Sequence, residues 1–176
     1  MRDPAPLAVP MAANQCWSCD FMSDALWDGR RFRTFNVVDD FNREALAIEV
    51  DTSLPSERVV RILDQTTEVR GLPKRLRFDN GPELTSIAVA EWAEANQVEL
   101  EFIKPGRPMQ NGFVERFNRS YREAVLDMYI FESLDEVREK TDEWLETYNH
   151  HRPHDSLGGM PPSEYLAKQN IGNLYS

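Results

Sequence analysis

Three short runs rich in aromatic and β-branched residues come first in this chain, and helix-like segments follow them. The runs are Cys16 to Met22, Arg31 to Val38 and Ala45 to Val50, separated by Asp28-Gly29-Arg30 and by Asp39-Asp40-Phe41-Asn42. Runs of this length between turn residues are typical of consecutive antiparallel strands joined by hairpins. We expect Asp39 and Asp40 to shape the second turn, because aspartate side chains hydrogen-bond to their own main chain in turns.

The rest of the chain alternates between helix and strand. The pattern predicts a helix from Pro55 or Ser56 to Gly71, a strand over Leu76 to Asp79, a helix from Thr85 or Ser86, and a strand over Val98 to Ile103. Two longer helices complete it, over Asn111 to Met128 and from the capping box Ser133-Leu-Asp-Glu136 to a point before Pro153. This order predicts an α/β fold: a five-stranded mixed sheet, three antiparallel strands followed by two parallel additions, flanked by helices.

The length of 176 residues and an apolar content of 41% suit one folded domain. We expect a linker or tail over residues 1–14, the core over 15–166 and a C-terminal tail over 167–176. No apolar run is long enough to span a membrane, and prolines interrupt the start, where a signal peptide needs a continuous apolar region. We therefore expect a cytoplasmic protein without a membrane partner.

The charge is unevenly distributed. A net charge of −10 argues against a general nucleic-acid binder, because affinity for a phosphate backbone comes mostly from Lys and Arg. Seven acids, however, lie between Glu132 and Glu146, whereas Glu115 is the single acid between Phe102 and Arg122. That second stretch contains the basic residues Lys104, Arg107, Arg116, Arg119 and Arg122. One face is therefore expected to be basic although the whole chain is acidic.

Two small clusters, one of cysteines and one of histidines, have the residue types of metal sites, but we interpret neither as a metal site. Cys16 and Cys19 are three apart on a predicted strand, where their side chains point to opposite faces. We interpret them as two ordinary thiols in a reducing compartment. His150, His151 and His154 follow a helix end, and we interpret them as part of a capping turn rather than a zinc site.

Three acids form a stronger candidate site. Asp20 falls within the first predicted strand, Asp79 at the end of the fourth and Glu115 near the start of a helix, with 35 residues between the last two. Adjacent first and fourth strands would bring the aspartates together. Three carboxylates in a confined site call for a cation, and Mg²⁺ prefers such oxygen ligands.

Two Mg²⁺ ions about 4 Å apart would activate the attacking oxygen and stabilise the leaving oxygen of a phosphoryl displacement. Asp20 would bridge both ions, Asp79 would complete one site and Glu115 the other. Each acid also has a simpler reading. Asp20 is then a strand-edge acid with Asp24, Asp39 and Asp40 as competitors, Asp79 a turn residue, and Glu115 a solvated helix acid.

The flanking residues fit a nucleic-acid substrate. Lys104 and Arg107 lie on a predicted loop, and Arg116, Arg119 and Arg122 follow Glu115 along its helix. Together they are candidate DNA-binding residues, although charged helix faces are often merely solvated. Four polar residues could orient the metal ligands or the substrate, or could simply form hydrogen bonds to the nearby main chain. They are Asn80, Gln110, Asn111 and Asn118.

Several motifs in order carry a family resemblance. They are Trp17-Ser-Cys-Asp20-Phe-Met-Ser-Asp24, Phe35-Asn-Val-Val-Asp-Asp-Phe-Asn-Arg43, Arg77-Phe-Asp-Asn-Gly-Pro-Glu83, Pro105-Gly-Arg-Pro-Met-Gln-Asn-Gly112, Glu115-Arg-Phe-Asn-Arg119 and Tyr148-Asn-His-His-Arg-Pro-His154 with Ser156-Leu-Gly158. From about Gln15 to Leu166 the chain closely resembles the catalytic region of bacterial insertion-sequence transposases related to retroviral integrases.

The resemblance implies a ribonuclease-H-like fold and a DDE transposase whose three metal-binding acids match Asp20, Asp79 and Glu115. The implied reaction is DNA strand cleavage followed by strand transfer, with two Mg²⁺ ions when substrate is bound and with Mn²⁺ as a substitute. The implied partners are DNA, both element ends and target, and further copies of the chain in a homo-oligomer. The protein would then be bacterial, and nucleoid-associated when bound to DNA.

Two departures from the family pattern matter. The helix-turn-helix region that usually recognises the element ends does not fit in the first 14 residues, so we expect a catalytic core. Cys19 stands where relatives often have methionine. Two other functions remain open: a metal-dependent nuclease of the same fold that never joins strands, and a catalytically silent remnant that acts as an interaction module.

Overall fold

One mixed sheet forms the centre of the molecule. The computed structural model describes residues 8–78, 87–103 and 112–174. Its strands lie in the order β3-β2-β1-β4-β5 and are β1 (Cys16–Ala25), β2 (Arg31–Asp39), β3 (Ala45–Asp51), β4 (Arg75–Phe78) and β5 (Glu99–Phe102). The pairs β1–β2 and β2–β3 are antiparallel, whereas β4 runs parallel to β1 and β5 parallel to β4. The predicted fold class is therefore confirmed.

The two aspartates expected in the second turn behave differently. Asp39 Oδ1 accepts a hydrogen bond from Phe41 N at 3.0 Å, which is the local turn contact expected of it. The prediction for Asp40 was wrong. Its buried carboxylate accepts from Ser18 Oγ at 2.5 Å and from Arg77 Nη1 at 3.1 Å, and so links the turn to β1 and β4.

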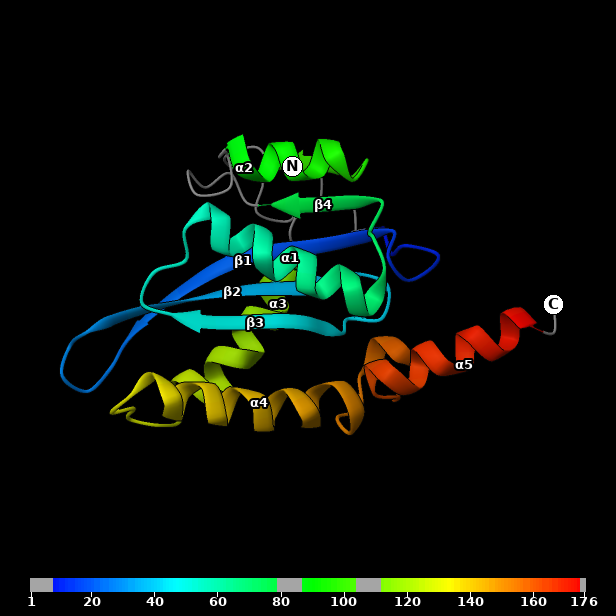
Figure 1. Ribbon diagram of the computed structural model, residues 1–176. Coiled ribbons are helices and arrows are strands. Elements are labelled where there is room, and N and C mark those ends of the chain that lie inside the picture. The colour runs from blue at the N-terminus through cyan, green and yellow to red at the C-terminus, as the bar shows by residue number, and fades with distance from the viewer. Residues whose placement is uncertain (1–7, 79–86, 104–111, 175–176) are drawn as a thin grey trace, which may run out of the picture.

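Helices cover both faces of the sheet, with α1 in front of it and α3 behind it in the view of Figure 1. One face packs against α1 (Ser56–Arg70) and α2 (Ile87–Ala95) through a core that includes Trp17, Leu63 and Trp92. The other packs against α3 (Gly112–Tyr121) and α4 (Leu134–His150), with the core residues Met22, Phe117, Tyr121 and Val137. Successive side chains on a strand alternate between faces, so the even-numbered residues of β1 around Met22, Asp20 among them, lie on the α3 side.

The long helix predicted over Asn111 to Met128 changes its winding partway. After α3 comes a π-helical turn, η3 (Arg122–Leu126), in which Asp127 N donates to Arg122 O at 2.8 Å. The extra residue in that turn rotates everything after it by about 100° relative to an α-helix. The helix ends at Leu126, and Met128 in the turn that follows is 66% exposed, so its predicted place in the buried stripe was wrong.

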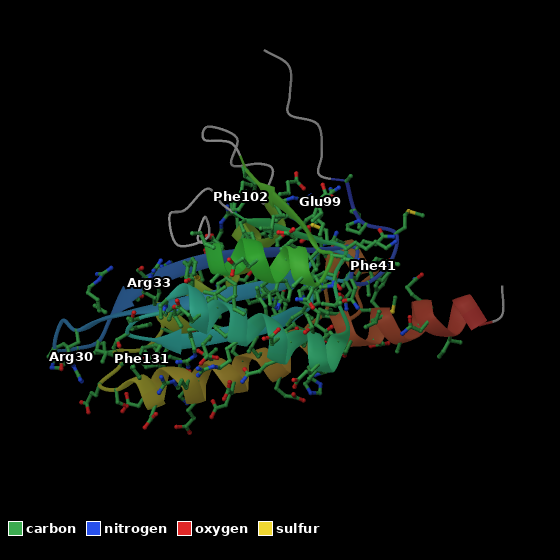
Figure 2. All side chains as sticks on the ribbon, turned by 45° about the horizontal axis from the view of Figure 1, so that its top comes forward. Arg30, Arg33, Phe41, Glu99, Phe102 and Phe131 are labelled. Atoms are coloured by element: carbon green, nitrogen blue, oxygen red, sulfur yellow. The ribbon has the colours of Figure 1, made fainter. Side chains whose placement is uncertain are left out.

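The start of α4 confirms its predicted N-cap. Ser133 Oγ accepts a hydrogen bond from Glu136 N at 3.2 Å. The Glu136 carboxylate accepts from Glu132 N at 2.9 Å, one residue earlier than in the usual capping box. Before this helix, Trp27 N donates to Phe131 O at 2.7 Å, so the tip of the β1–β2 hairpin meets the α4 entry segment. Figure 2 shows Arg30 and Phe131 close to each other at this end of the molecule.

The end of the described chain contains a helix that the sequence pattern did not predict. After the short 3₁₀-helix η4 (Asp155–Leu157), α5 (Pro162–Leu174) extends away from the sheet (Figure 1) and runs through residue 166, where the core was expected to end. Pro162 at its first position is favourable, because the missing N–H there costs no helical hydrogen bond. Phe41, labelled in Figure 2, anchors this helix through the Tyr165 ring at 5.5 Å between centroids.

The segment before β1 is fixed by Asn14. Its N donates to Asp39 Oδ2 at 2.9 Å, its Nδ2 donates to Arg70 O at 2.6 Å, and its Oδ1 accepts from Trp17 Nε1 at 3.0 Å. Cys16 and Cys19 are buried thiols and do not form a disulfide, as expected. None of the helices in the described ranges is both long and apolar enough to cross a bilayer.

Candidate functional site

Asp20 lies in the middle of β1, half-buried on the face covered by α3. Asn118 Nδ2 of α3 donates to Asp20 Oδ2 at 2.9 Å, and Phe21 N donates to Asp20 Oδ1 at 2.8 Å. Each carboxylate oxygen thus has a donor, one from the neighbouring helix and one from the strand itself. These contacts fix the orientation of the carboxylate.

Asn36 supports the contact between Asn118 and Asp20, and it was not among the site residues predicted from the sequence. In the β1–β2 register Asn36 is the direct partner of Asp20, so both side chains lie on the same face. Asn36 is fully buried, and its Nδ2 donates to Asn118 Oδ1 at 2.7 Å. A polar residue between Phe35 and Val37 of a buried strand, opposite the candidate acid across a hairpin, was the signal that could have found it.

Glu115 lies in the first turn of α3 and is half-buried. It precedes Asn118 by three residues, and residues three apart share a helix face. Because Asn118 contacts Asp20, the face that carries Glu115 is the one that packs over β1. The structure therefore joins Asp20 to Asn118 and puts Glu115 one turn before that contact.

The arginines predicted to bind DNA have different surroundings. Arg122 is engaged within the molecule, since Nη1 lies 3.2 Å from Asp24 Oδ2 and Nη2 donates to Ser23 O at 3.2 Å. Asp24, which the sequence offered as an alternative to Asp20 for the metal site, is thus paired with Arg122. Arg119 is exposed. Arg116 is exposed on a neighbouring face of α3, where it lines a pocket with Arg43.

Several predicted site residues lie outside the described residues: Asp79, Asn80, Lys104, Arg107, Gln110 and Asn111. The strands that lead to the two aspartates are adjacent, as expected. Cys19 pairs in parallel with Phe78, and these residues directly precede Asp20 and Asp79 in the sequence.

Two of the three predicted metal ligands, Asp20 and Glu115, lie within the described residues. Within residues 8–78, 87–103 and 112–174, no group of three or more His, Cys, Asp or Glu side chains could hold a metal ion. Asp20 and Glu115 supply the carboxylate oxygens that Mg²⁺ prefers, and the held orientation of Asp20 fits a ligand role.

Comparison with known proteins gives consistent results. Two family models described as integrase core domain match residues 10–108 and 96–162. An insertion element IS407 protein of Burkholderia multivorans is 44% identical over 162 residues, which are 92% of this chain and 58% of that protein. An insertion element IS476 protein of Xanthomonas euvesicatoria is 43% identical over 154 residues, which are 88% of this chain and 44% of that protein. The chain thus spans about half the length of these relatives.

Solved structures agree on the fold. The HTLV-2 integrase catalytic core domain in complex with magnesium superposes with a TM-score of 0.71 at 18% identity, covering 89% of this chain and 98% of that one. The BIV integrase catalytic core domain gives a TM-score of 0.66 at 18% identity and covers 92% of this chain and 99% of that one. The sheet and its covering helices therefore have the ribonuclease-H-like arrangement of these cores.

Proposed function

The chain belongs to the integrase core domain family, and from this premise we propose that it is the catalytic part of an insertion-sequence transposase. Its reaction is cleavage of a DNA strand followed by attack of the freed 3′-hydroxyl on another phosphodiester. The insertion-element origin of the similar proteins supports this substrate. The structural observation that carries the proposal is the hydrogen bond from Asn118 to Asp20, one helical turn after Glu115.

Asp20, Asp79 and Glu115 hold Mg²⁺ in this proposal, two ions when DNA is bound, and Mn²⁺ substitutes. The bound ions would activate the attacking oxygen and stabilise the leaving oxygen. The magnesium named with the HTLV-2 integrase core supports the choice of a divalent cation. The registered pairing of Cys19 with Phe78 supports the participation of Asp79.

The other residues position these acids and the DNA. Asn118 and the Phe21 N–H hold the Asp20 carboxylate in one orientation, and Asn36 in turn holds the Asn118 amide. Arg122 holds the end of α3 against β1 through Asp24. The proposed contacts to the DNA backbone are Lys104, Arg107, Arg116, Arg119 and Arg122, and the proposed supports of the ligands are Asn80, Gln110, Asn111 and Asn118.

We also propose that active copies assemble as a homo-oligomer on DNA. The solved HTLV-2 integrase cores are named in trimeric and dimeric forms, which supports self-association in this fold. Light scattering of the chain with and without DNA tests this. A single mass equal to one copy under both conditions argues against assembly.

The reaction is tested with a labelled strand that ends in a 3′-hydroxyl, a plasmid target and Mg²⁺. Asp20→Asn and Glu115→Gln should each lower joining by about 1,000-fold, because several kcal/mol of charge stabilisation depends on the bound ions. Glu123→Gln is the matched control, since Glu123 is exposed in η3, close to Glu115 in the sequence. Undiminished joining by either acid variant contradicts the proposal.

A second readout does not need activity. Calorimetric titration with Mn²⁺ should give binding heat for the unchanged chain and for Glu123→Gln, and little for Asp20→Asn. Equal heat for Asp20→Asn removes Asp20 from the metal site. Hydrolysis without any joined product would indicate a nuclease, and Mn²⁺ binding without either product would leave only the metal assignment.

A further inference from the structure

A pocket of about 400 Å³ lies on the face of α3 next to the one that carries Glu115. Its walls come from α3, from the end of α4 with the residues after it, and from the β2–β3 turn. Three aromatic rings line it, those of Phe113, Phe117 and Tyr148, and Phe117 meets Tyr148 edge-on at 5.1 Å between centroids. Three guanidinium groups join them, from Arg43, Arg116 and Arg152.

Two of these arginines, Arg43 and Arg152, lie over aromatic rings of the pocket. The Arg43 guanidinium carbon lies 4.5 Å from the Phe113 centroid, and Nη1 donates to Asp40 O and Phe41 O, both at 2.8 Å. Arg152 lies over the Tyr148 ring at 5.9 Å. A guanidinium held over a ring can still donate to a ligand through those N–H groups that have no partner within the protein.

The positive charges of these arginines are only partly balanced, by Asp40 near Arg43 and by Asp155 in the lining of the pocket. Across the described residues, no carboxylate forms a salt bridge with Arg43, Arg116 or Arg152, whereas Arg58, Arg70 and Arg122 each have at least one. The chain has 30 acids and 20 Lys and Arg residues, so a shortage of carboxylates is not the reason. Among the described residues that line the pocket, Asp155 is the one acid.

The electrostatic coupling of the group is visible in its pKa values. Burial lowers the pKa of Arg43, and the positive charge of Arg116 lowers it further, against the effect of Asp40. Burial raises the pKa of Tyr148, although Arg152, Arg43 and Arg116 all act to lower it. One tyrosine therefore senses all three arginines, which shows that their positive charges converge.

His154 adds an unsatisfied polar atom. Its ring meets Tyr148 edge-on at 4.8 Å between centroids, and its Nε2 is buried without a hydrogen-bond partner in the described structure. A buried polar atom without a partner costs free energy. A ligand with negatively charged oxygen atoms would neutralise the arginines, and it would also satisfy His154 Nε2 when that nitrogen carries a proton.

We propose that this pocket binds a phosphodiester group of the DNA backbone, which rests on the proposed function. Phosphate oxygens match the forked N–H edges of arginine, and the apolar rings suit the neighbouring sugar. Arg116 follows Glu115 directly and is turned about 100° from it around α3, so a strand that passes Glu115 reaches the pocket by crossing one helix. The contact surface thus extends to Arg43 and Arg152, which lie far from the three acids in the sequence.

The test measures binding of a fluorescein-labelled duplex to the 176-residue chain in EDTA, over a series of salt concentrations. Arg152→Gln and Arg116→Gln should each weaken binding about tenfold, since a charged hydrogen bond is lost. Each should also reduce the slope of log affinity against log salt by about 0.9. Arg61→Gln is the matched control, because it removes the same charge from an exposed position on α1, on the other side of the sheet.

The outcomes separate this inference from the proposed function. Equal affinity and slope for Arg152→Gln, Arg116→Gln and Arg61→Gln overturn the pocket assignment and leave the transposase proposal standing. A different outcome is that the unchanged chain binds inorganic phosphate, that Arg152→Gln loses this binding, and that Arg152→Gln keeps its affinity for DNA. That result assigns the pocket to a free phosphate and overturns the DNA assignment. No duplex binding by the unchanged chain overturns both. Circular dichroism of each variant verifies folding.

Discussion

The carboxylate of Asp20 depends on two amides from two different elements. Asn118 donates to it from α3, and Asn36 on β2 holds Asn118. Neither amide carries a net charge, so both fix the orientation of the Asp20 carboxylate and add no charge to its surroundings. This arrangement is the usual way in which proteins orient a metal ligand from behind.

Asn118→Ala should therefore weaken Mn²⁺ binding by about 10- to 100-fold, the usual cost of removing a group that orients a ligand. Calorimetric titration measures the loss, and thermal melting should show that the fold persists. Asn170→Ala on the exposed surface of α5 is the control and should leave Mn²⁺ affinity unchanged. Equal affinities for the two variants would remove Asn118 from any role at the metal.

The buried carboxylate of Asp40 contributes to the response of the fold to pH. Burial raises the pKa of Asp40 from 3.8 to about 6, although the Ser18 hydroxyl and the Arg77 guanidinium act to lower it. The folded state then binds this proton more tightly than the unfolded state does. The stabilisation by protonated Asp40 is complete below about pH 4 and is lost as the pH rises through about 6.

We expect the unfolding free energy of the unchanged chain to fall across this pH window relative to that of Asp40→Asn. Urea denaturation at several pH values measures the difference between the two proteins. Asp142→Asn, at an exposed position of α4, should run parallel to the unchanged chain. A constant difference between the Asp40→Asn and unchanged chains from pH 4 to 6 contradicts the raised pKa.

Among the elements, the helical segment that carries Glu115 loses its buried stripe where it ends. The π-helical turn η3 follows α3 directly, and Val125 and Leu126 within it are buried while Met128 beyond it is exposed. Exposed Met128 lies in the segment that links η3 to α4. The start of α4 then depends on its cap.

Ser133→Ala should lower the unfolding free energy by about 1 kcal/mol, because Glu136 N loses its side-chain acceptor. Ser53→Ala, at an exposed position before α1, is a matched loss of one hydroxyl and should change stability by less than about 0.5 kcal/mol. Denaturant titration of both variants makes the comparison. An equal effect of the two changes would mean that the Ser133 cap contributes nothing.

For the molecule as a whole, one sheet separates two cores and supports both. β1 contributes Trp17 and Cys19 to the core under α1 and Met22 to the core over α3. Since the same strands form both cores, loss of either should release the other. The molecule is therefore expected to unfold in one step.

Leu63→Ala and Val137→Ala remove fully buried side chains from opposite cores. Leu63→Ala should cost about 2–5 kcal/mol and Val137→Ala somewhat less, because both leave cavities. Each variant should still show one transition, with the same midpoint by far-ultraviolet circular dichroism and by tryptophan fluorescence. Separate midpoints would show that the two faces of the sheet unfold independently.

Much of this architecture follows from local patterns. The three hairpin-linked strands and the helices over Ser56–Arg70 and Leu134–His150 were predicted close to their observed bounds, because apolar periodicity and caps act within a few residues. The misses have equally physical causes. Met128 was misplaced because the helix ends at Leu126, two residues earlier, and α5 was missed because few of its residues are buried and no strong apolar stripe marks it.

The amino-acid sequence by itself determined the order of elements, the mixed sheet and the candidate acids Asp20, Asp79 and Glu115. Only the tertiary structure decided that Asn118 and Asn36 support Asp20, that Arg122 pairs with Asp24, and that Arg43, Arg116 and Arg152 converge on one pocket. Periodicity describes neighbours along the chain, whereas the Asn118–Asp20 contact joins residues 98 apart. Such contacts depend on how α3 packs across the sheet, and the packing of both cores sets that position.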